Sequence, residues 1–396
     1  MFDREGLEST VHQTGQGGTP LRGEPFDLAV VASALAAKPF NPHRSFRNGH
    51  AQTLAAYAWP RRSRLRALHC DDETQLFEVE PGVRLLAHCA WQRERRAHPT
   101  VVLVHGLEGS SESIYMLGTA QKAFSAGFNV LRCNMRNCGG TEHLTPTLYH
   151  SGMSNDFRAV LRELIEEDHL ASIFLVGFSM GGNIILKLAG EIGARTPPEL
   201  SGVCAVSPAL DLSACADQIG HRSNWLYQRT FVRSLRKRVH GKRRLYPDLY
   251  DTSGLHTVRS VRDFDDQYTA LHGGYRDAAD YYEQASARRL VSHIRTPTLI
   301  IHAQDDPLVP FASFRHPAIA ANPKVMLLAP SRGGHVGFVA DDARHDEDRF
   351  WAENRVVEFC RLIYTESYIA LDSGGAHDQL AMSYDARGLR DERARK

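Results

Sequence analysis

Serine, aspartate and histidine side chains that could together transfer an acyl group occur at the ends of apolar runs in this sequence. Ser179 lies in the stretch "GFSMG", which matches G-x-S-x-G, between the apolar run 173–176 and the helical segment "NIILKLAGEIG". A strand, a sharp turn and a helix are the context of a nucleophile elbow, in which the turn presents the Ser hydroxyl above the sheet edge. The sequence therefore predicts that Ser179 is a nucleophile.

A serine nucleophile needs a base that takes its proton and an acid that orients the base. The stretch "HAQDDPLVP" supplies Asp305 and Asp306 after one predicted strand, and "PSRGGHVGF" supplies His335 after the next. The chain order Ser, acid, His is that of a nucleophile-elbow enzyme. We predict His335 as the base and Asp306 as the acid, and the Asp-x-x-Val-Pro spacing favours Asp306 over Asp305. Asp211, which follows an earlier strand, is a third candidate for the acid.

Three other histidines are weaker candidates for the base because of their positions. His302 lies within a predicted strand, His316 in a helix-like segment and His345 in a charged surface run.

Acyl transfer also needs donors for the oxyanion. The stretch "HGLEGS" follows an apolar run, and we assign the oxyanion hole to the backbone N–H groups of Leu107 and Met180, the residue after the nucleophile. The "HGLEGS" stretch fits neither a P-loop nor a dinucleotide-binding fingerprint, and the chain has no H-E-x-x-H or other metal-binding spacing. We therefore expect no cofactor and no metal.

Short β-branched runs alternate with amphipathic helical segments, which is typical of a mainly parallel sheet covered by helices. A hairpin of two strands is predicted over 76–91. Six further strands begin at Thr100, Asn129, Ile173, Gly202, Thr298 and Val325. Helices are predicted between them, one of them from Ser154, which could cap its N-terminus, and the last from Trp351.

The predicted organisation has six segments. They are a disordered N-terminus (1–25), an N-terminal extension with the first hairpin (26–98), the first part of a core (99–207), a helical cap without strand signals (208–295), the second part of the core (296–366) and a flexible C-terminal tail (367–396).

Composition and charge narrow the class of protein. The net charge is +1 and 42% of the residues are hydrophobic, a profile of a globular chain without a global field that would attract nucleic acid. The seven Cys are odd in number and scattered, and the first residues lack the pattern of a signal peptide. We therefore expect reduced thiols and a cytoplasmic location. The oligomeric state cannot be inferred.

The segment 224–250 is rich in Arg and Lys among aromatic residues. Phe231, Leu235 and Val239 fall four apart, so one helix could carry an apolar stripe beside a cationic surface. Such a helix could contact anionic lipid at a membrane surface. The interpretation we favour is a cap helix whose stripe packs on the core, and nucleic-acid binding is a distant third.

With these residues in place, the chain resembles the α/β-hydrolase superfamily and, more narrowly, its YheT-like branch, which includes abhydrolase-domain lipases and ester-forming acyltransferases. The narrower resemblance rests on motifs taken together: "NGHAQTL", "HGLEGS", "NMRNCGG", "YHSGMSND", "GFSMGGN", "DDPLVP" and "GGHVGF". It implies an α/β-hydrolase fold with an eight-stranded, mostly parallel sheet, helices on both faces and a cap, and a triad of Ser179, Asp306 and His335. Asn137 departs from the Gly that is usual after the Arg, although Asn also tolerates a left-handed backbone.

These observations predict a serine hydrolase that cleaves carboxylic esters, either short- to medium-chain or lipid-like, through an acyl-enzyme. One alternative is an acyltransferase that passes the acyl group to an alcohol instead of water. Another is a non-catalytic binding protein that retains the fold.

Overall fold

A single mixed sheet organises the protein. The computed structural model describes residues 28–59, 73–343 and 346–372, and its eight strands lie in the order β1-β2-β4-β3-β5-β6-β7-β8. β1 and β2 form an antiparallel hairpin, β2 pairs antiparallel with β4, and all other neighbours are parallel. The strands are β1 (Glu73–Glu80), β2 (Val83–Ala90), β3 (Thr100–Val104), β4 (Asn129–Cys133), β5 (Ile173–Phe178), β6 (Leu200–Val206), β7 (Thr298–Ile301) and β8 (Val325–Leu328). The predicted eight-stranded, mostly parallel sheet is confirmed.

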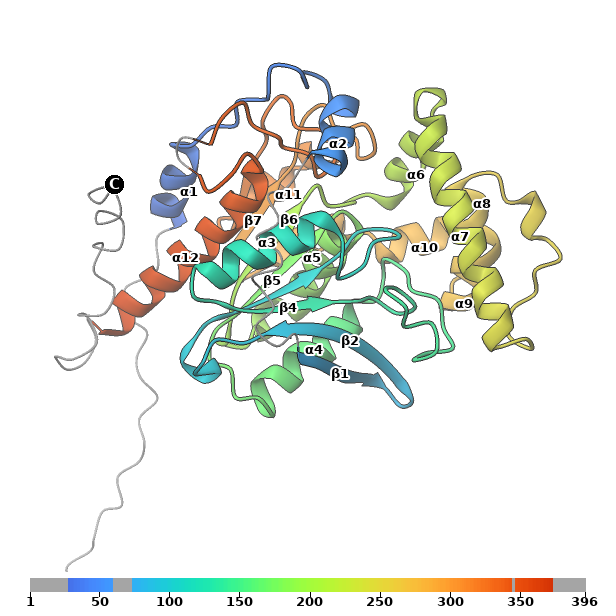
Figure 1. The fold of residues 1–396 in the computed structure, drawn as a ribbon, viewed down its shortest axis with the longest axis horizontal. Coiled ribbons are helices and arrows are strands. Elements are labelled where there is room, and N and C mark those ends of the chain that lie inside the picture. Colours follow the sequence, from blue (N-terminus) through green and yellow to red (C-terminus); the bar gives the residue numbers. More distant parts are fainter. Residues whose placement is uncertain (1–27, 60–72, 344–345, 373–396) are drawn as a thin grey trace, which may run out of the picture. The chain divides into compact units, whose positions relative to one another are not determined.

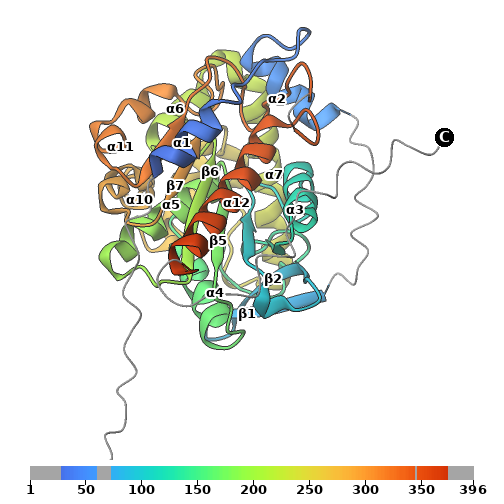
Figure 2. The ribbon, with the colours of Figure 1, turned by 90° about the vertical axis from the view of Figure 1, so that its left-hand side faces the viewer.

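Helices cover both faces of this sheet, as predicted. On β5, Phe174 packs toward Phe359 of α12, while the adjacent Ile173 and Leu175 join the buried cluster that contains α4 and α5, because alternate strand residues point to opposite faces. Figure 2 shows α12 crossing the strands on one side. The principal covering helices are α3 (Ile114–Ser125), α4 (Ser154–Glu166), α5 (Met180–Ile192), α11 (Pro317–Ala321) and α12 (Trp351–Asp372).

The N-terminus of α4 differs from the prediction in one detail. Met153, not Ser154, occupies the N-cap position, and Ser154 is the first helical residue. The Ser154 hydroxyl donates instead to Glu191 of α5, over 2.7 Å. Ser154 therefore links two helices and does not cap one.

The interval between β6 and β7 is helical, in agreement with the absence of strand signals there. Figure 1 shows α7 to α10 gathered at one end of the sheet. On α7, Leu235 and Val239 are buried in a cluster with other cap residues and with Leu148, so the stripe packs inward as we favoured. The cap helices are α6 (Leu212–Gly220), α7 (Trp225–Leu245), α8 (Val261–Phe264), α9 (Ala270–Gly273) and α10 (Ala278–Ala285), with a π-helical turn over Asp265–Thr269.

The N-terminal extension contains two helices, α1 (Leu28–Ala36) and α2 (Gly49–Ala58). Gln52 of α2 is fully buried and binds the loop that follows β8: its amide donates to Val339 O, and its carbonyl oxygen accepts from Val339 N–H at 2.7 Å. The same amide donates to Phe46 O at 2.8 Å. The motif "NGHAQTL" thus holds a distant loop in place.

Residues 27–364 form one compact unit. The predicted disordered N-terminus 1–25 and Cys70 lie outside the described residues, and so does the tail beyond 372, although α12 continues past residue 366 to Asp372. The six described cysteines are buried: Cys89, Cys133, Cys138, Cys204, Cys215 and Cys360. No helix within 28–59, 73–343 and 346–372 is long and apolar enough to cross a membrane.

Truncation of Gln52 to Ala is expected to destabilise the protein. The substitution leaves the Val339 N–H without its acceptor, removes the donor to Phe46 O and opens a cavity, at a cost of about 2–4 kcal/mol in free energy of unfolding. Urea denaturation measures this change. Leu54→Ala, on the exposed side of the same helix, is the matched control, and equal midpoints for the two variants would contradict the role of Gln52.

Candidate active site

Ser179 occupies the sharp turn between β5 and α5. Its φ of +53° lies in the left-handed region, which is strained for a residue with a side chain. The turn is held by its backbone: Ser179 N–H donates to Val206 O at 2.9 Å, and Ser179 O accepts from Asn183 N–H at 3.1 Å. A Cβ at Gly181 would overlap the carbonyl oxygens of Val104 and His105, so this position admits only Gly. The geometry is that of a nucleophile elbow.

His335 bridges Ser179 and Asp306. Its Nε2 lies 2.9 Å from Ser179 Oγ, and its Nδ1 lies 2.8 Å from Asp306 Oδ2. The imidazole and the carboxylate are buried, whereas Ser179 is half-buried. The structure thus brings together three predicted residues that follow three separate strands, β5, β7 and β8.

The surroundings of Asp306 keep it ionised. Burial alone would raise its pKa, but the interaction with His335 and further hydrogen bonds outweigh burial and lower it. Asp306 Oδ1 accepts from Leu308 N–H at 2.8 Å and from Val309 N–H at 2.9 Å. The Asp-x-x-Val spacing therefore has a physical basis, because the backbone of Val309 folds back onto the carboxylate.

The other candidate acids have different partners. Asp305 Oδ1 accepts from Gly334 N–H at 2.9 Å, which braces the loop that carries His335. Asp211 caps the N-terminus of α6 and forms an ion pair with Arg288 at 2.6 Å. Of the three acids, Asp306 is the one that contacts His335.

Of the weaker histidine candidates, the two that the structure describes, His302 and His316, do not contact Ser179. His302 directly follows β7, is fully buried and stacks on Phe314 with ring centroids 3.8 Å apart. Burial lowers the pKa of His302 to about 4, so its ring is neutral near pH 7. His316 is exposed and caps α11, and His345 lies outside the described residues.

The two predicted oxyanion donors line the same cavity as Ser179. Gly106 N–H donates to Tyr115 Oη at 3.0 Å and Glu108 N–H donates to Tyr149 Oη at 2.8 Å. Leu107, between them, and Met180 have no acceptor for their N–H groups within the part of the chain that the structure describes. Both donors are therefore available to an oxygen bound beside Ser179.

A clamp that sequence reasoning missed holds the loop of Leu107. Glu108, at φ +57°, accepts a hydrogen bond from Tyr149 Oη at 2.7 Å and from Arg238 Nε at 2.8 Å, and also bonds to Ser234. Burial opposes ionisation of Glu108, yet the charge and hydrogen bonds of Arg238 lower its pKa overall. Arg238 and Ser234 belong to α7, so the cap is bound to the loop of Leu107. From the sequence alone, Arg238 was only one of several cations in the segment 224–250.

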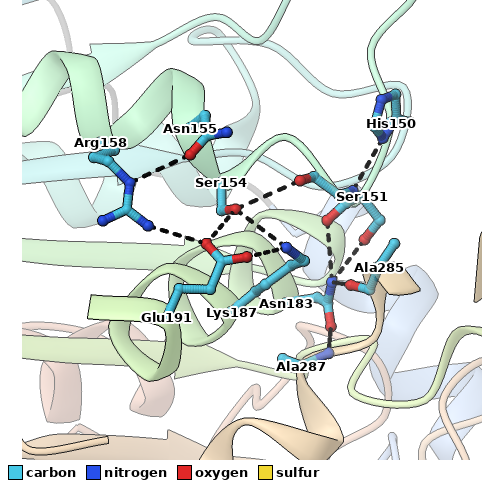
Figure 3. A network of polar contacts seen from close by, with 11 residues as sticks. His150, Ser151, Ser154, Asn155, Arg158, Asn183, Lys187, Glu191, Ala285 and Ala287 are labelled. Atoms are coloured by element: carbon cyan, nitrogen blue, oxygen red, sulfur yellow. Dashed lines mark hydrogen bonds and ion pairs between the residues drawn. The ribbon is translucent and has the colours of Figure 1, made fainter. Parts of the chain in front are cut away.

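A second network links the elbow helix to the cap (Figure 3). Asn183, fully buried on α5, donates to Ser151 Oγ at 2.9 Å and to Ala285 O at 2.8 Å, while its carbonyl oxygen accepts from Ala287 N–H at 2.8 Å. The Asn of "GFSMGGN" and the first Ser of "YHSGMSND" are thus structural partners. Asn137 does adopt the expected left-handed backbone, at φ +66°.

The N-terminal extension also supports the base. Thr53 Oγ1 accepts from His335 N–H at 2.8 Å, one residue along α2 from Gln52. Gly49 packs so closely on Asp305 that a Cβ there would overlap its carbonyl oxygen. The sequence signal for these contacts was the motif "NGHAQTL", whose role could not be assigned without the fold.

The cavity above Ser179 is mainly apolar and is covered by the cap. Its apolar lining includes Leu107, Met180, Leu212, Ile219, Phe231, Leu235, Val261, Phe264, Leu308 and Val309. No group of three or more His, Cys, Asp or Glu that could hold a metal occurs among the described residues. The arrangement suits attack by a serine hydroxyl on the carbonyl of an apolar acyl compound.

Comparison with known proteins agrees with this geometry. The sequence pattern of the alpha/beta hydrolase fold family matches residues 99–342. YheT of Escherichia coli, whose name refers to an esterase, is 33% identical over 325 residues, which cover 81% of this chain and 92% of YheT. The mouse protein Phospholipase ABHD3 is 30% identical over 251 residues, 63% of this chain and 61% of that protein.

Among solved structures, an esterase from Pyrococcus furiosus, Pf2001, superposes with a TM-score of 0.49 at 18% identity, over 82% of this chain and 98% of that chain. Together, the match over 99–342 and the similarity to YheT show that the chain belongs to the α/β-hydrolase family, in the branch that contains YheT.

Proposed function

We propose that this protein is a serine esterase that cleaves carboxylic esters through an acyl-enzyme on Ser179. The observation that carries the proposal is the unbroken hydrogen-bond chain from Ser179 through His335 to Asp306. The names of YheT and ABHD3, an esterase and a phospholipase, support ester hydrolysis. The apolar cavity supports an acyl group of short or medium length, or a lipid-like ester.

In the proposed mechanism, Ser179 Oγ attacks the ester carbonyl while His335 Nε2 takes its proton. The Leu107 and Met180 N–H groups stabilise the negative charge that develops on the carbonyl oxygen. His335 then gives the proton to the departing alcohol, and the same base activates water to release the acid. Asp306 accepts from Nδ1 throughout, which fixes the tautomer that leaves Nε2 as the acceptor.

Removal of the nucleophile is the first test. Ser179→Ala should lower kcat for p-nitrophenyl esters by roughly 10⁴- to 10⁶-fold, because the acyl-enzyme cannot form. Hydrolysis is measured with acyl chains from acetyl to palmitoyl, and the preferred length distinguishes small esters from lipids. Ser172→Ala, just before β5, is the control. Equal activity of wild-type protein and Ser179→Ala would reject the esterase and favour transfer or binding.

Asp306→Asn tests the assignment of the acid. The substitution keeps the size of the side chain but lets its amide favour the wrong tautomer of His335, so kcat should fall by roughly 10²- to 10⁴-fold. Asp305→Asn is the matched control, because Asn can still accept the bond from Gly334 N–H. Full activity in Asp306→Asn, or an equal loss in both variants, would refute the assignment.

We also propose that the outer side of α7 contacts anionic membranes. The groove along this helix is lined by Arg and Lys side chains and contains no Asp or Glu, and Trp225 at its end is 59% exposed. Arg238 and Lys242 point inward to the core, as their contacts with Glu108 and with Thr145 O show. Exposed cations of α7 that line the groove include Arg229, Arg233, Lys237 and Arg244. Charge complementarity favours an anionic lipid surface, which would place the cap at a source of lipid esters.

Co-sedimentation with vesicles tests this contact. Binding to vesicles that contain phosphatidylserine should exceed binding to phosphatidylcholine vesicles and should weaken with salt. Joint replacement of Arg229, Arg233 and Lys237 by Gln should reduce it roughly 100-fold, at about 1 kcal/mol for each cation. The control replaces the exposed Arg162, Arg195 and Arg361 by Gln. Equal binding of both vesicle types, or binding of RNA alone, would contradict the proposal.

A further inference from the structure

One acidic side chain lines the cavity that contains Ser179. Among the described residues of the cavity wall, Asp265 is the sole Asp or Glu. It begins the π-helical turn Asp265–Thr269 between α8 and α9. Such turns are rare and occur frequently at functional sites. An ionisable group in a largely apolar cavity needs an explanation, because unpaired charge is costly there.

The hydrogen bonds of Asp265 leave part of its capacity unused. Oδ1 accepts from Thr269 Oγ1 at 2.7 Å and Oδ2 accepts from Tyr282 Oη at 2.8 Å. An ionised carboxylate has about four acceptor positions, so about two remain. Both hydroxyl partners line the cavity as well, and each retains lone pairs of its own.

No cation among the described residues forms an ion pair with this carboxylate. Arg262 is the charged residue that acts on Asp265, but its guanidinium donates to Ser213 and to Asp217. Burial raises the pKa of Asp265 to about 6, which reflects the cost of its charge in this wall. A hydrogen-bond donor supplied by a bound molecule would lower that cost.

We propose that Asp265, Thr269 and Tyr282 form a polar subsite that receives an aliphatic hydroxyl group of the ester substrate. This inference rests on the proposed esterase function and narrows its substrate class. The substrate hydroxyl donates to a free acceptor position of Asp265, while the rest of the substrate lies against apolar side chains. A neutral hydroxyl is favoured over an ammonium group because the positive charge of Arg262 acts on the same place.

The competing explanation is purely structural. Asp265 joins the π-helical turn to Tyr282 of α10, so it could simply hold the cap together. A structural role would affect all esters alike, through stability or through the shape of the cavity. Discrimination between two esters that differ only by a hydroxyl separates the two explanations.

The experiment uses ester pairs in which OH replaces CH₃ at one end. One pair places the change in the alcohol portion, 2-hydroxyethyl hexanoate against propyl hexanoate. The other places it in the acyl portion, ethyl 6-hydroxyhexanoate against ethyl heptanoate. The quantity compared is kcat/KM for the hydroxyl ester divided by kcat/KM for the methyl ester. For at least one pair, Asp265→Asn should lower this ratio about ten-fold relative to wild type. The loss should appear mainly as a higher KM for the hydroxyl ester.

Asp266→Asn is the matched control, because it makes the same chemical change at an exposed neighbour. Asp265→Ala should abolish the preference, and thermal denaturation reports whether either variant is merely unstable. An unchanged ratio for both pairs would overturn the subsite. So would a larger gain for ethyl 6-aminohexanoate than for its hydroxyl counterpart.

Ester binding to Ser179→Ala protein tests this inference independently of the esterase proposal. Calorimetric titration with the same esters requires no turnover. A hydroxyl preference in Ser179→Ala that disappears in the Ser179→Ala, Asp265→Asn double variant supports the subsite even if wild-type protein hydrolyses neither ester. Equal affinities in the two proteins reject it even if hydrolysis is established.

Discussion

The hydrogen bond between His335 and Ser179 joins segments more than 150 residues apart in the chain, so its geometry requires that both segments be held in place. Neither residue can hold the other at 2.9 Å without support. The elbow fixes Ser179 from the side of β5, and Asp306 fixes His335 from the side of β7. A parallel sheet makes this feasible, since the carboxyl ends of its strands meet at one edge. The hydrolase fold thus serves as the frame for a few short polar contacts.

Much of this frame could be predicted from the sequence. Parallel strands are short, continuous apolar runs, and all six were identifiable, as were the two strands of the hairpin. The elbow, acid and base followed from motifs at strand ends. The choice of Asp306 over Asp305 relied on a spacing whose cause, the N–H groups of Leu308 and Val309, became visible only in the structure.

The contacts that sequence reasoning missed are long-range and polar. Gln52 and Thr53 reach the loop of His335 across more than 280 residues, and Glu108 meets Arg238 across 130. Periodicity reports which face of an element is apolar, but it carries no information about which buried polar groups pair. The assignment of Ser154 as a cap failed for the same reason, because its true partner, Glu191, lies on another helix.

The cap helix α7 has three sets of side chains with different roles, although in the sequence it looks like a single basic segment. Phe231 and Leu235 line the cavity, Arg238 holds the loop of Leu107 through Glu108, and the outward cations face solvent. Because one helix carries all three sets, a shift of α7 that widened the cavity would also pull on Glu108 and hence on the neighbouring Leu107 N–H. The position of α7 and that of the Leu107 loop are therefore linked through Glu108. Asp265 reaches the cavity from a different part of the cap, because its π-helical turn lies between the short helices α8 and α9.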